Sequence, residues 1–466
     1  MNEKEMKALG YQIIDYIVEH RLHLKDRAVY DMNSVDNLAS VIKQAPPAKG
    51  RPAEEVFAKL HELVGSNMVH TDHPRFFSFI PGPSSYTSIL ADTLSVGMNV
   101  FAGHWMASPA AGMIEKQTIQ WLTQFFGYDD KAGGLFLSGG SMANMSAIVA
   151  ARDKAFTERS FSKGIIYYSE QTHSSIAKAA RILGFKADNL RPIATTADFK
   201  LSIAALSEQM ETDLANGYEP FCIIGNAGTT NTGAIDDLRA LSDIAQAYHC
   251  WLHIDGAYGG ATIMSEKYKH LIDSINLADS VSIDPHKWWF QPYETACLLV
   301  KDSLDLKRSF AVEAEYLDDT VRDDSEINYY DYGPQLTRSF RALKLYSYIL
   351  CQGTEQMGED ITRGIEHAEY IEQRMANSDY WEIVSQASIG IISFRARPGG
   401  FAGDLDELNT ALSQFTYHDG YTMITTTKLN GHVTLRMCPI NPKTTQEDID
   451  ISIDKMEAFI ANYLTN

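Results

Sequence analysis

Lys287 stands where an apolar stretch ends, in surroundings that suit covalent chemistry. The run 280–283 precedes it, and it lies between His286 and the pair Trp288–Trp289. We expect a lysine packed among aromatic side chains to be partly desolvated, which lowers the pKa of the amine and frees its lone pair. Such an amine can form a Schiff base with an aldehyde. A lysine is usually solvated surface, but these neighbours disfavour that interpretation.

Asp255 ends another apolar run, 251–254. An aspartate and a lysine on neighbouring strand ends match pyridoxal phosphate (PLP), which has a protonated ring nitrogen and a reactive aldehyde. An ionised carboxylate beside the ring nitrogen keeps it protonated, so that the ring can withdraw electrons from a substrate α-carbon. The plainer alternative is a structural aspartate that bonds to nearby backbone.

The runs that carry these residues alternate with helical patterns between residues 72 and 345. This alternation predicts a mostly parallel sheet with helices on both faces, and functional groups at the carboxyl ends of its strands. Strands are predicted at 164–168, 221–225, 251–254, 280–283 and 296–300. Helices are predicted at 141–155, 174–183, 236–249 and 267–278.

Two smaller zones flank this large domain. Residues 1–71 have helical spacing at 6–20 and 52–64, with a break at 44–50, and are too few to bury a core alone. We expect them to pack on the rest of the chain or on a second subunit. Residues 346–466 predict a small α+β domain with helices at 361–376 and 445–463 and strands at 389–396 and 432–438.

Three further motifs have weaker signals. Gly139-Gly140-Ser141 can open a helix whose N-terminus binds phosphate. An isolated match of this kind is more often an ordinary helix cap, but its position after an apolar run favours the phosphate site. His173, after the strand 164–168, can stack on a flat cofactor or transfer protons, but a surface or capping histidine is as common. A turn alone explains Thr229 in the segment 226–233.

Composition excludes several classes of partner. The chain has 466 residues and a formal net charge of −20, which argues against binding to nucleic acid or anionic membrane. It has no apolar run long enough for a membrane span and no signal-peptide pattern at its start. Its five scattered cysteines predict buried, reduced thiols in a cytoplasmic protein, and no metal site is predicted.

In combination, the motifs resemble those of the PLP-dependent group II amino acid decarboxylases. The resemblance runs from about residue 11 to 463 and implies an aspartate aminotransferase-like α/β fold (fold type I) with a seven-stranded-type sheet. It rests on His73-Pro74-Arg75-Phe76-Phe77, Pro83-Ser84-Ser85-Tyr86, Trp105 with Ser108-Pro109, Gly139-Gly140-Ser141, His173-Ser174-Ser175, Asp255 with Ala257-Tyr258, and Asp284 with His286-Lys287.

The resemblance implies a role for each residue around the cofactor ring. Lys287 would hold PLP covalently, and Asp255 would pair with the ring nitrogen. Ala257 would lie against one face of the ring, and His173 would stack on the other.

The phosphate side follows in the same way. Gly140, Ser141 and His286 would bind or flank the phosphate, and Thr229 would lie near the ring hydroxyl or the substrate carboxylate. Asp284 stands where many relatives have asparagine, and a carboxylate close to a phosphate needs compensation.

The family's mobile catalytic loop resembles the segment 311–317. Its tyrosine would be Tyr316, which would protonate the α-carbon after carbon dioxide leaves, with His173 as a further carrier of the proton. Relatives with phenylalanine there tend toward aldehyde formation, so tyrosine favours simple decarboxylation. An exposed loop aromatic is the plainer alternative.

An apolar substrate pocket resembles that of the aromatic amino acid branch, in part from a second subunit. We therefore expect decarboxylation of tyrosine, Dopa, tryptophan or phenylalanine by a homodimer. The pocket residues would be Phe79, Pro81, Phe101, Trp105 and Thr337.

Several alternatives stay open. Within PLP enzymes they are a glutamate or 2,4-diaminobutyrate decarboxylase, for which Arg75 is a candidate cation, and an aromatic aldehyde synthase. A PLP-binding protein without catalysis is a further class. A nucleotide-binding oxidoreductase is disfavoured because the Gly139-Gly140 loop lacks the GxGxxG pattern.

Overall fold

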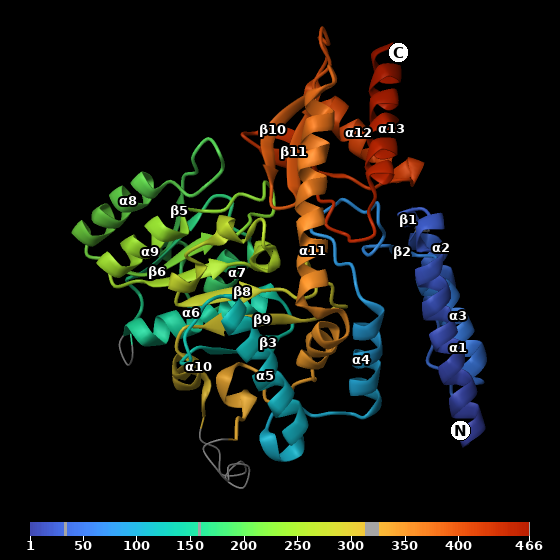
Figure 1. Cartoon of the computed structure of the whole chain (residues 1–466), viewed down its shortest axis with the longest axis horizontal. Coiled ribbons are helices and arrows are strands. Elements are labelled where there is room, and N and C mark those ends of the chain that lie inside the picture. Colours follow the sequence, from blue (N-terminus) through green and yellow to red (C-terminus); the bar gives the residue numbers. More distant parts are fainter. Residues whose placement is uncertain (32–34, 157–159, 313–325, 466) are drawn as a thin grey trace.

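The computed structural model describes residues 1–31, 35–156, 160–312 and 326–465, and a seven-stranded sheet forms its centre (Figure 1). The strand order is β3-β9-β8-β7-β6-β4-β5. The bounds are β3 Gly133–Leu137, β4 Gly164–Ser169, β5 Leu190–Ile193, β6 Glu219–Asn226, β7 Trp251–Asp255, β8 Ser280–Ile283 and β9 Ala296–Val300. Strands β4 to β8 pair in parallel, and β9 is antiparallel to both β8 and β3. The prediction of a mostly parallel sheet is confirmed.

Helices cover both faces of this sheet, as the alternation along β7 shows. His253 and Asp255 point to the face on which α6 (Gly140–Phe156) lies, and both contact its Asn144. Ile254 points to the opposite face, where Gly225 lies under side chains of α9 (Leu238–Ala247). The other helices of the large domain are α4 Tyr86–Gly97, α5 Pro109–Phe125, α7 Ser175–Ile182, α8 Ile203–Ala215 and α10 Ser303–Phe310.

Two predictions for this domain fail for local reasons. The strand β5 was not predicted, because it is a partly exposed edge strand that contains Pro192. The helix predicted at 267–278 is wrong. Two 3₁₀ turns, Lys269–Ile272 and Ile275–Leu277, stand in its place, because Ser274 between them adopts a left-handed conformation with φ of 75°.

A four-stranded antiparallel sheet, in the order β10-β11-β13-β12, forms the C-terminal part. Phe394, Leu412 and Ile453 belong to its own fully buried core. The long helix α11 reaches it from the large domain and departs from helical geometry at Gly353. The elements are α11 Ala342–Ala376, β10 Trp381–Ser388, β11 Ile391–Ala396, α12 Leu405–Asp419, β12 Thr425–Leu429, β13 His432–Met437 and α13 Gln446–Thr465.

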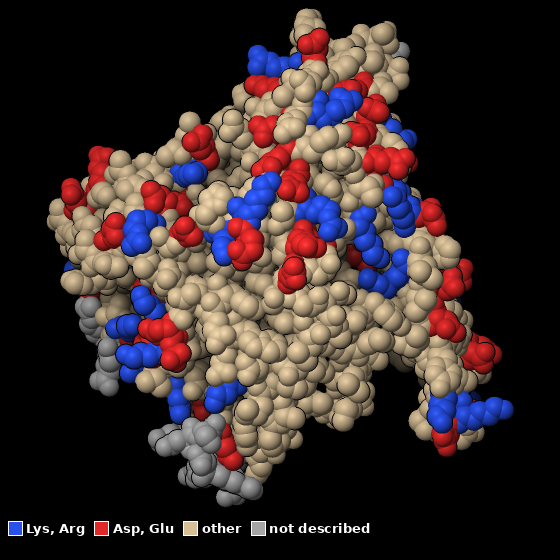
Figure 2. Space-filling model, in the orientation of Figure 1, with Lys and Arg blue, Asp and Glu red and all other residues tan. Residues whose placement is uncertain are grey.

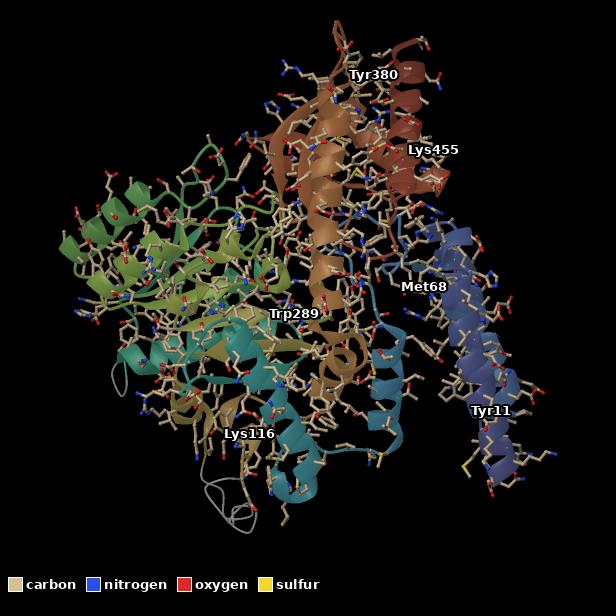
Figure 3. The ribbon with its side chains drawn as sticks, viewed as in Figure 1. Tyr11, Met68, Lys116, Trp289, Tyr380 and Lys455 are labelled. Atoms are coloured by element: carbon tan, nitrogen blue, oxygen red, sulfur yellow. The ribbon has the colours of Figure 1, made fainter. Side chains whose placement is uncertain are left out.

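The N-terminal helices α1 (Glu3–Leu22), α2 (Val35–Ile42) and α3 (Ala53–Gly65) lie along one side of the molecule (Figure 1). Neither α1 nor α3 has a buried residue. In Figure 3, Tyr11 lies on the outer helix α1, whereas Trp289 lies inside the large domain. Strands β1 (Tyr30–Asp31) and β2 (Met68–Val69) join this segment to the body, where Val29 packs with Phe76 and Met423. The segment therefore depends on neighbours for its stability.

Two composition-based expectations can be compared with this fold. No described helix is both long enough and apolar enough to cross a membrane. Four cysteines are buried, as predicted, but Cys351 on α11 is exposed, so the expectation of burial is wrong for that residue.

A buried ion pair ties the first and last parts of the large domain together. Arg338 and Glu115 of α5 are each 1% exposed, and Arg338 also donates to the carbonyl oxygens of Ala102 and Phe136. Glu115 in turn accepts from the backbone N–H of Phe136, at 3.0 Å. Each charge therefore depends on the other for its compensation.

The substitution Glu115→Ala should lower the free energy of unfolding of the large domain by about 3–5 kcal/mol, because it leaves Arg338 buried without its partner. Chemical denaturation measures this loss. The control is Glu3→Ala, which breaks the exposed Lys7–Glu3 pair and should leave stability unchanged. Equal stability of the two variants would show that the buried pair is not needed.

Candidate active site

A cavity of about 300 Å³ opens at the carboxyl ends of the parallel strands. Its volume lies at the lower end of the range of small-molecule sites, roughly 300–1,000 Å³. Every residue that the sequence assigns to cofactor binding lines it. These residues are Gly140, Ser141, His173, Thr229, Asp255, Ala257, Asp284, His286 and Lys287.

The amine of Lys287 lies 2.9 Å from Oδ2 of Asp284, three residues before it. Burial by itself lowers the pKa of Lys287, but the carboxylates of Asp284 and Asp255 raise it, and it lies above the ordinary value of a lysine. The prediction of a lowered pKa is therefore wrong. The sequence showed the aromatic neighbours that desolvate the amine, but not that the turn 284–287 brings a carboxylate to it.

Asp284 is 2% exposed and lies over the first turn of α6. A Cβ added at Gly140 would lie 2.8 Å from Oδ2 of Asp284, so that only glycine fits there without a shift. The other carboxylate oxygen of Asp284, Oδ1, has no hydrogen-bond partner in the described structure. The N-terminus of a helix attracts negative charge, and here a carboxylate of the chain itself faces it.

Asp255 is fixed by hydrogen bonds from three parts of the fold. Oδ1 accepts from the backbone N–H of Ala257 at 3.1 Å and from the hydroxyl of Ser282 at 3.4 Å. Oδ2 accepts from the side-chain amide of Asn144 at 2.9 Å. Donors on both oxygens stabilise the negative charge of a carboxylate that is only 8% exposed.

His173 and His286 are held through one ring nitrogen each. His173 is exposed, and its Nδ1 lies 2.9 Å from the hydroxyl of Ser175. Nδ1 of His286 accepts from the backbone N–H of Thr295 at 3.1 Å. Burial lowers the pKa of His286, although Asp284 opposes the effect. At neutral pH, His286 is therefore neutral, with its proton on Nε2 because Nδ1 accepts.

Thr229 lies in a turn whose hydroxyls bond to one another. Its Oγ1 lies 2.8 Å from that of Thr232 and accepts from the backbone N–H of Ala234. Gly228 beside it has a positive φ of 95°, under Tyr258 and Ile389. The turn that explains these residues also forms a wall of the cavity.

The donor set of this cavity fits PLP. Lys287 supplies an amine, Asp255 supplies a fixed carboxylate, and the glycines at the start of α6 leave space beside a helix N-terminus. These groups match the aldehyde, the protonated ring nitrogen and the phosphate, respectively. Asp284 alone opposes the phosphate, because its unpartnered oxygen adds negative charge on that side.

The five residues predicted for the substrate pocket do not line this cavity. The turn after Phe79 and Pro81 approaches it, since a Cβ at Gly82 would meet the backbone oxygen of His286. The other three lie together elsewhere, where the backbone N–H of Ala102 donates to the carbonyl of Arg338. This second group consists of Phe101, Trp105 and Thr337. Tyr316 lies outside the described residues.

Asn144 and Ser175 line the cavity as well, and sequence reasoning did not identify a role for them. Asn144 follows Gly140 by one helical turn on α6, and this spacing was the available signal. Ser175 belongs to the motif around His173. Both residues contact groups to which a chemical role was assigned.

Comparisons with known proteins agree with this geometry. Residues 36–397 match a family model described as the pyridoxal-dependent decarboxylase conserved domain. An aromatic-L-amino-acid decarboxylase of Bacillus atrophaeus is 39% identical over 452 residues, which cover 96% of this chain and 94% of that protein. A phenylacetaldehyde synthase of Petunia hybrida is 28% identical, with coverage of 97% and 93%.

A solved structure is similar along its full length. The crystal structure of Oryza sativa TDC with PLP and tryptamine superimposes with a TM-score of 0.94 at 27% identity and covers 99% of both chains. The α/β architecture of the chain, with its large and small sheets, is therefore that of a PLP-dependent enzyme of fold type I.

The substitution Asp284→Asn should speed the capture of PLP by the cofactor-free protein near neutral pH. Asp284 raises the pKa of Lys287 and thereby holds the proton that the amine must lose, so removing its charge lowers the pH at which Lys287 reacts. The gain is about tenfold for each pKa unit. Absorbance of bound PLP, followed over time at several pH values, measures it.

A matched control is Asp273→Asn, which removes one charge at an exposed position between β7 and β8. Its rate of capture should equal that of the unaltered protein. If Asp284→Asn captures PLP more slowly than the unaltered protein, or with the same pH dependence, the assigned role of Asp284 is wrong.

Proposed function

The chain belongs to the pyridoxal-dependent decarboxylase family, and on that basis we propose that it converts an aromatic L-amino acid to the corresponding amine and carbon dioxide. It is a PLP-dependent amino acid decarboxylase, with PLP as its cofactor. The observation that carries the proposal is the single cavity in which Lys287, Asp255 and His173 meet. The similarity to a bacterial aromatic-L-amino-acid decarboxylase over 96% of the chain supports the aromatic substrate.

The chain's own residues have separate tasks in this reaction. Bound PLP supplies the electron sink that accepts the electrons of the broken carbon–carboxylate bond. Lys287 would hold the cofactor through its amine. Asp255 would keep a proton on the ring nitrogen, and His173, which lines the cavity just before α7, would face the substrate. Tyr316 is proposed to return a proton to the α-carbon.

The preference for an aromatic side chain rests on Phe79 and the residues near it. Phe79 is 56% exposed, and its φ of 51° lies in the left-handed region, which is costly for a bulky residue. An exposed aromatic ring held by a strained backbone is more typical of a binding surface than of a core. Phe101 and Trp105 would supply a second aromatic wall from another subunit.

An aldehyde synthase is the second candidate, because a phenylacetaldehyde synthase is similar over nearly the whole chain. Tyr316 favours the amine as product. Oxidative formation of an aldehyde consumes oxygen and releases peroxide, and simple decarboxylation does neither. Peroxide therefore distinguishes the two reactions.

Purified protein with PLP should release carbon dioxide and an aromatic amine, without peroxide, from at least one of L-tyrosine, L-Dopa, L-tryptophan and L-phenylalanine. Lys287→Ala should reduce this release to background, because no other lysine lines the described part of the cavity. Chromatography of the amine, with carbon dioxide and peroxide followed together, is the measurement.

L-Glutamate, L-histidine and 2,4-diaminobutyrate complete the panel of substrates. Turnover of glutamate or the diamino acid alone would refute the aromatic pocket and keep the decarboxylase. Full activity of Lys287→Ala would refute the assigned role of the lysine.

We further propose that the chain acts as a homodimer. Figure 2 shows that the surface over α4 and α5 has few charged side chains. Large apolar side chains of these helices are exposed. Large apolar side chains gathered on an uncharged face favour a site of protein association. The N-terminal helices, which have no buried residue of their own, are a second surface for the partner. The exposed residues include Leu90, Leu94, Val96, Met98, Met106 and Met113.

The double substitution Leu94→Glu with Val96→Glu should convert the protein to a monomer, because it buries two charges in the proposed interface. These side chains are 57% and 72% exposed. Analytical ultracentrifugation measures the mass, and Leu214→Glu, at an exposed apolar position on α8, is the control. A monomeric unaltered protein, or a dimeric double variant, would contradict the proposal.

We propose a cytoplasmic location because the cysteine thiols form no disulfides. All five cysteines are free in the structure. Oxidising compartments favour disulfides, whereas reducing ones keep thiols free.

A further inference from the structure

Asn144 lines the cavity and makes three side-chain hydrogen bonds, two to residues of β7 and one to the first residue of α7. Its Nδ2 is 2.9 Å from Oδ2 of Asp255 on β7 and 3.0 Å from Oγ of Ser175 on α7. Its Oδ1 is 3.0 Å from Nε2 of His253. Asn144 is 1% exposed, so its amide group makes these bonds in place of bonds to water.

The orientation of the Asn144 amide is determined by Asp255. An ionised carboxylate only accepts hydrogen bonds, so the group that faces it must be the NH₂ of Asn144. The amide oxygen then faces His253, and only a protonated Nε2 of His253 can bond to it. The carboxylate of Asp255 therefore sets the direction of the hydrogen bonds that Asn144 makes.

The same direction continues below Asn144. Burial lowers the pKa of His253 to about 4, so the ring is neutral at neutral pH and its proton is on Nε2. Nδ1 must then accept from the hydroxyl of Ser280, at 2.8 Å. That hydroxyl accepts in turn from Nε1 of Trp251, at 2.8 Å, and an indole N–H can only donate. Every bond from Trp251 to Asn144 thus points toward the cavity.

Above Asn144 the bonds lead to His173. The second N–H of Asn144 donates to the hydroxyl of Ser175, and that hydroxyl lies 2.9 Å from Nδ1 of His173. The backbone N–H of Ser175 also donates to Nδ1, at 3.3 Å. Since an N–H donor faces it, Nδ1 is an acceptor, and the hydroxyl of Ser175 donates to it as well.

We propose that Asn144 and Ser175 are positioning residues that join Asp255 to His173 in one directed chain of hydrogen bonds, and that this chain keeps the proton of His173 on Nε2. His173 then presents a donor to the cavity, where an anionic oxygen of the substrate can accept from it. The inference deepens the proposed function, on which it rests, by giving His173 an orienting task. In this tautomer the ring has no free acceptor atom, so a proton passed through His173 would have to reverse the chain.

The tautomer of His173 can be measured without catalysis. Nitrogen NMR of the full-length protein, labelled at its histidine rings, separates Nδ1–H from Nε2–H forms, and the signal lost in His173→Gln identifies the residue. The unaltered protein should show Nε2–H. Ser175→Ala should show a mixture of both forms, because only the longer backbone contact of 3.3 Å remains.

Ser146→Ala is the matched control for this substitution. Ser146 is a fully buried serine on α6 whose hydroxyl has no partner in the described structure, so its removal should change neither the tautomer nor the rate. In the PLP-loaded enzyme, Ser175→Ala should lower kcat about fivefold to tenfold, which is the loss of one buried hydrogen bond, with little change in KM. Ser175→Thr, which keeps the hydroxyl, should restore the tautomer.

The outcomes separate this inference from the proposed function. An Nδ1–H form of His173 in the unaltered protein would contradict the proposed chain of hydrogen bonds. A Ser175→Ala variant that matches Ser146→Ala in tautomer and kcat would also contradict it. An Nε2–H form of His173 in a protein that decarboxylates none of the amino acids would support the chain of hydrogen bonds and refute the proposed decarboxylase function.

Discussion

Asp255 carries a buried negative charge at the end of β7, and such a charge is costly unless donors surround it. The donors come from a helix, from the neighbouring strand and from the turn that follows β7: Asn144, Ser282 and the backbone of Ala257. The bond from Ser282 requires the pairing of β7 with β8, and the bond from Asn144 requires the packing of α6 on the sheet. The requirement to hold this charge therefore links the packing of the core to the chemistry of the cavity.

The register of the parallel strands brings the other groups to the same edge. Asp255 pairs with Asn226 of β6 and with Ser282 of β8, so the segments that follow these strands converge. Lys287 and Asp284 follow β8, and Thr229 follows β6. The cavity is thus a consequence of strand order, and Asp284 adds a counter-charge that delays the reaction of the lysine with an aldehyde.

Apolar strands and their terminal residues were predictable from the sequence, because strands buried on both faces are continuous apolar runs. This is how Asp255, His173 and Lys287 were found. Long-range geometry was not predictable: Asn144 meets Asp255 across 111 positions, and no local pattern reports such a contact. The other two failures have local causes: the raised pKa of Lys287 depends in part on the turn that brings Asp284 to it, and the helix predicted at 267–278 is interrupted by the left-handed Ser274.

The central claim is that Lys287, and no other lysine, holds PLP. Lys344 is the competing candidate, because it is 3% exposed and burial lowers the pKa of its amine despite the nearby Asp92. Borohydride reduction of the PLP-loaded protein fixes the cofactor to its lysine, and peptide mass spectrometry then locates it. The account predicts the modification on Lys287 alone. Modification of Lys344 or another lysine, with Lys287 unmodified, would contradict it.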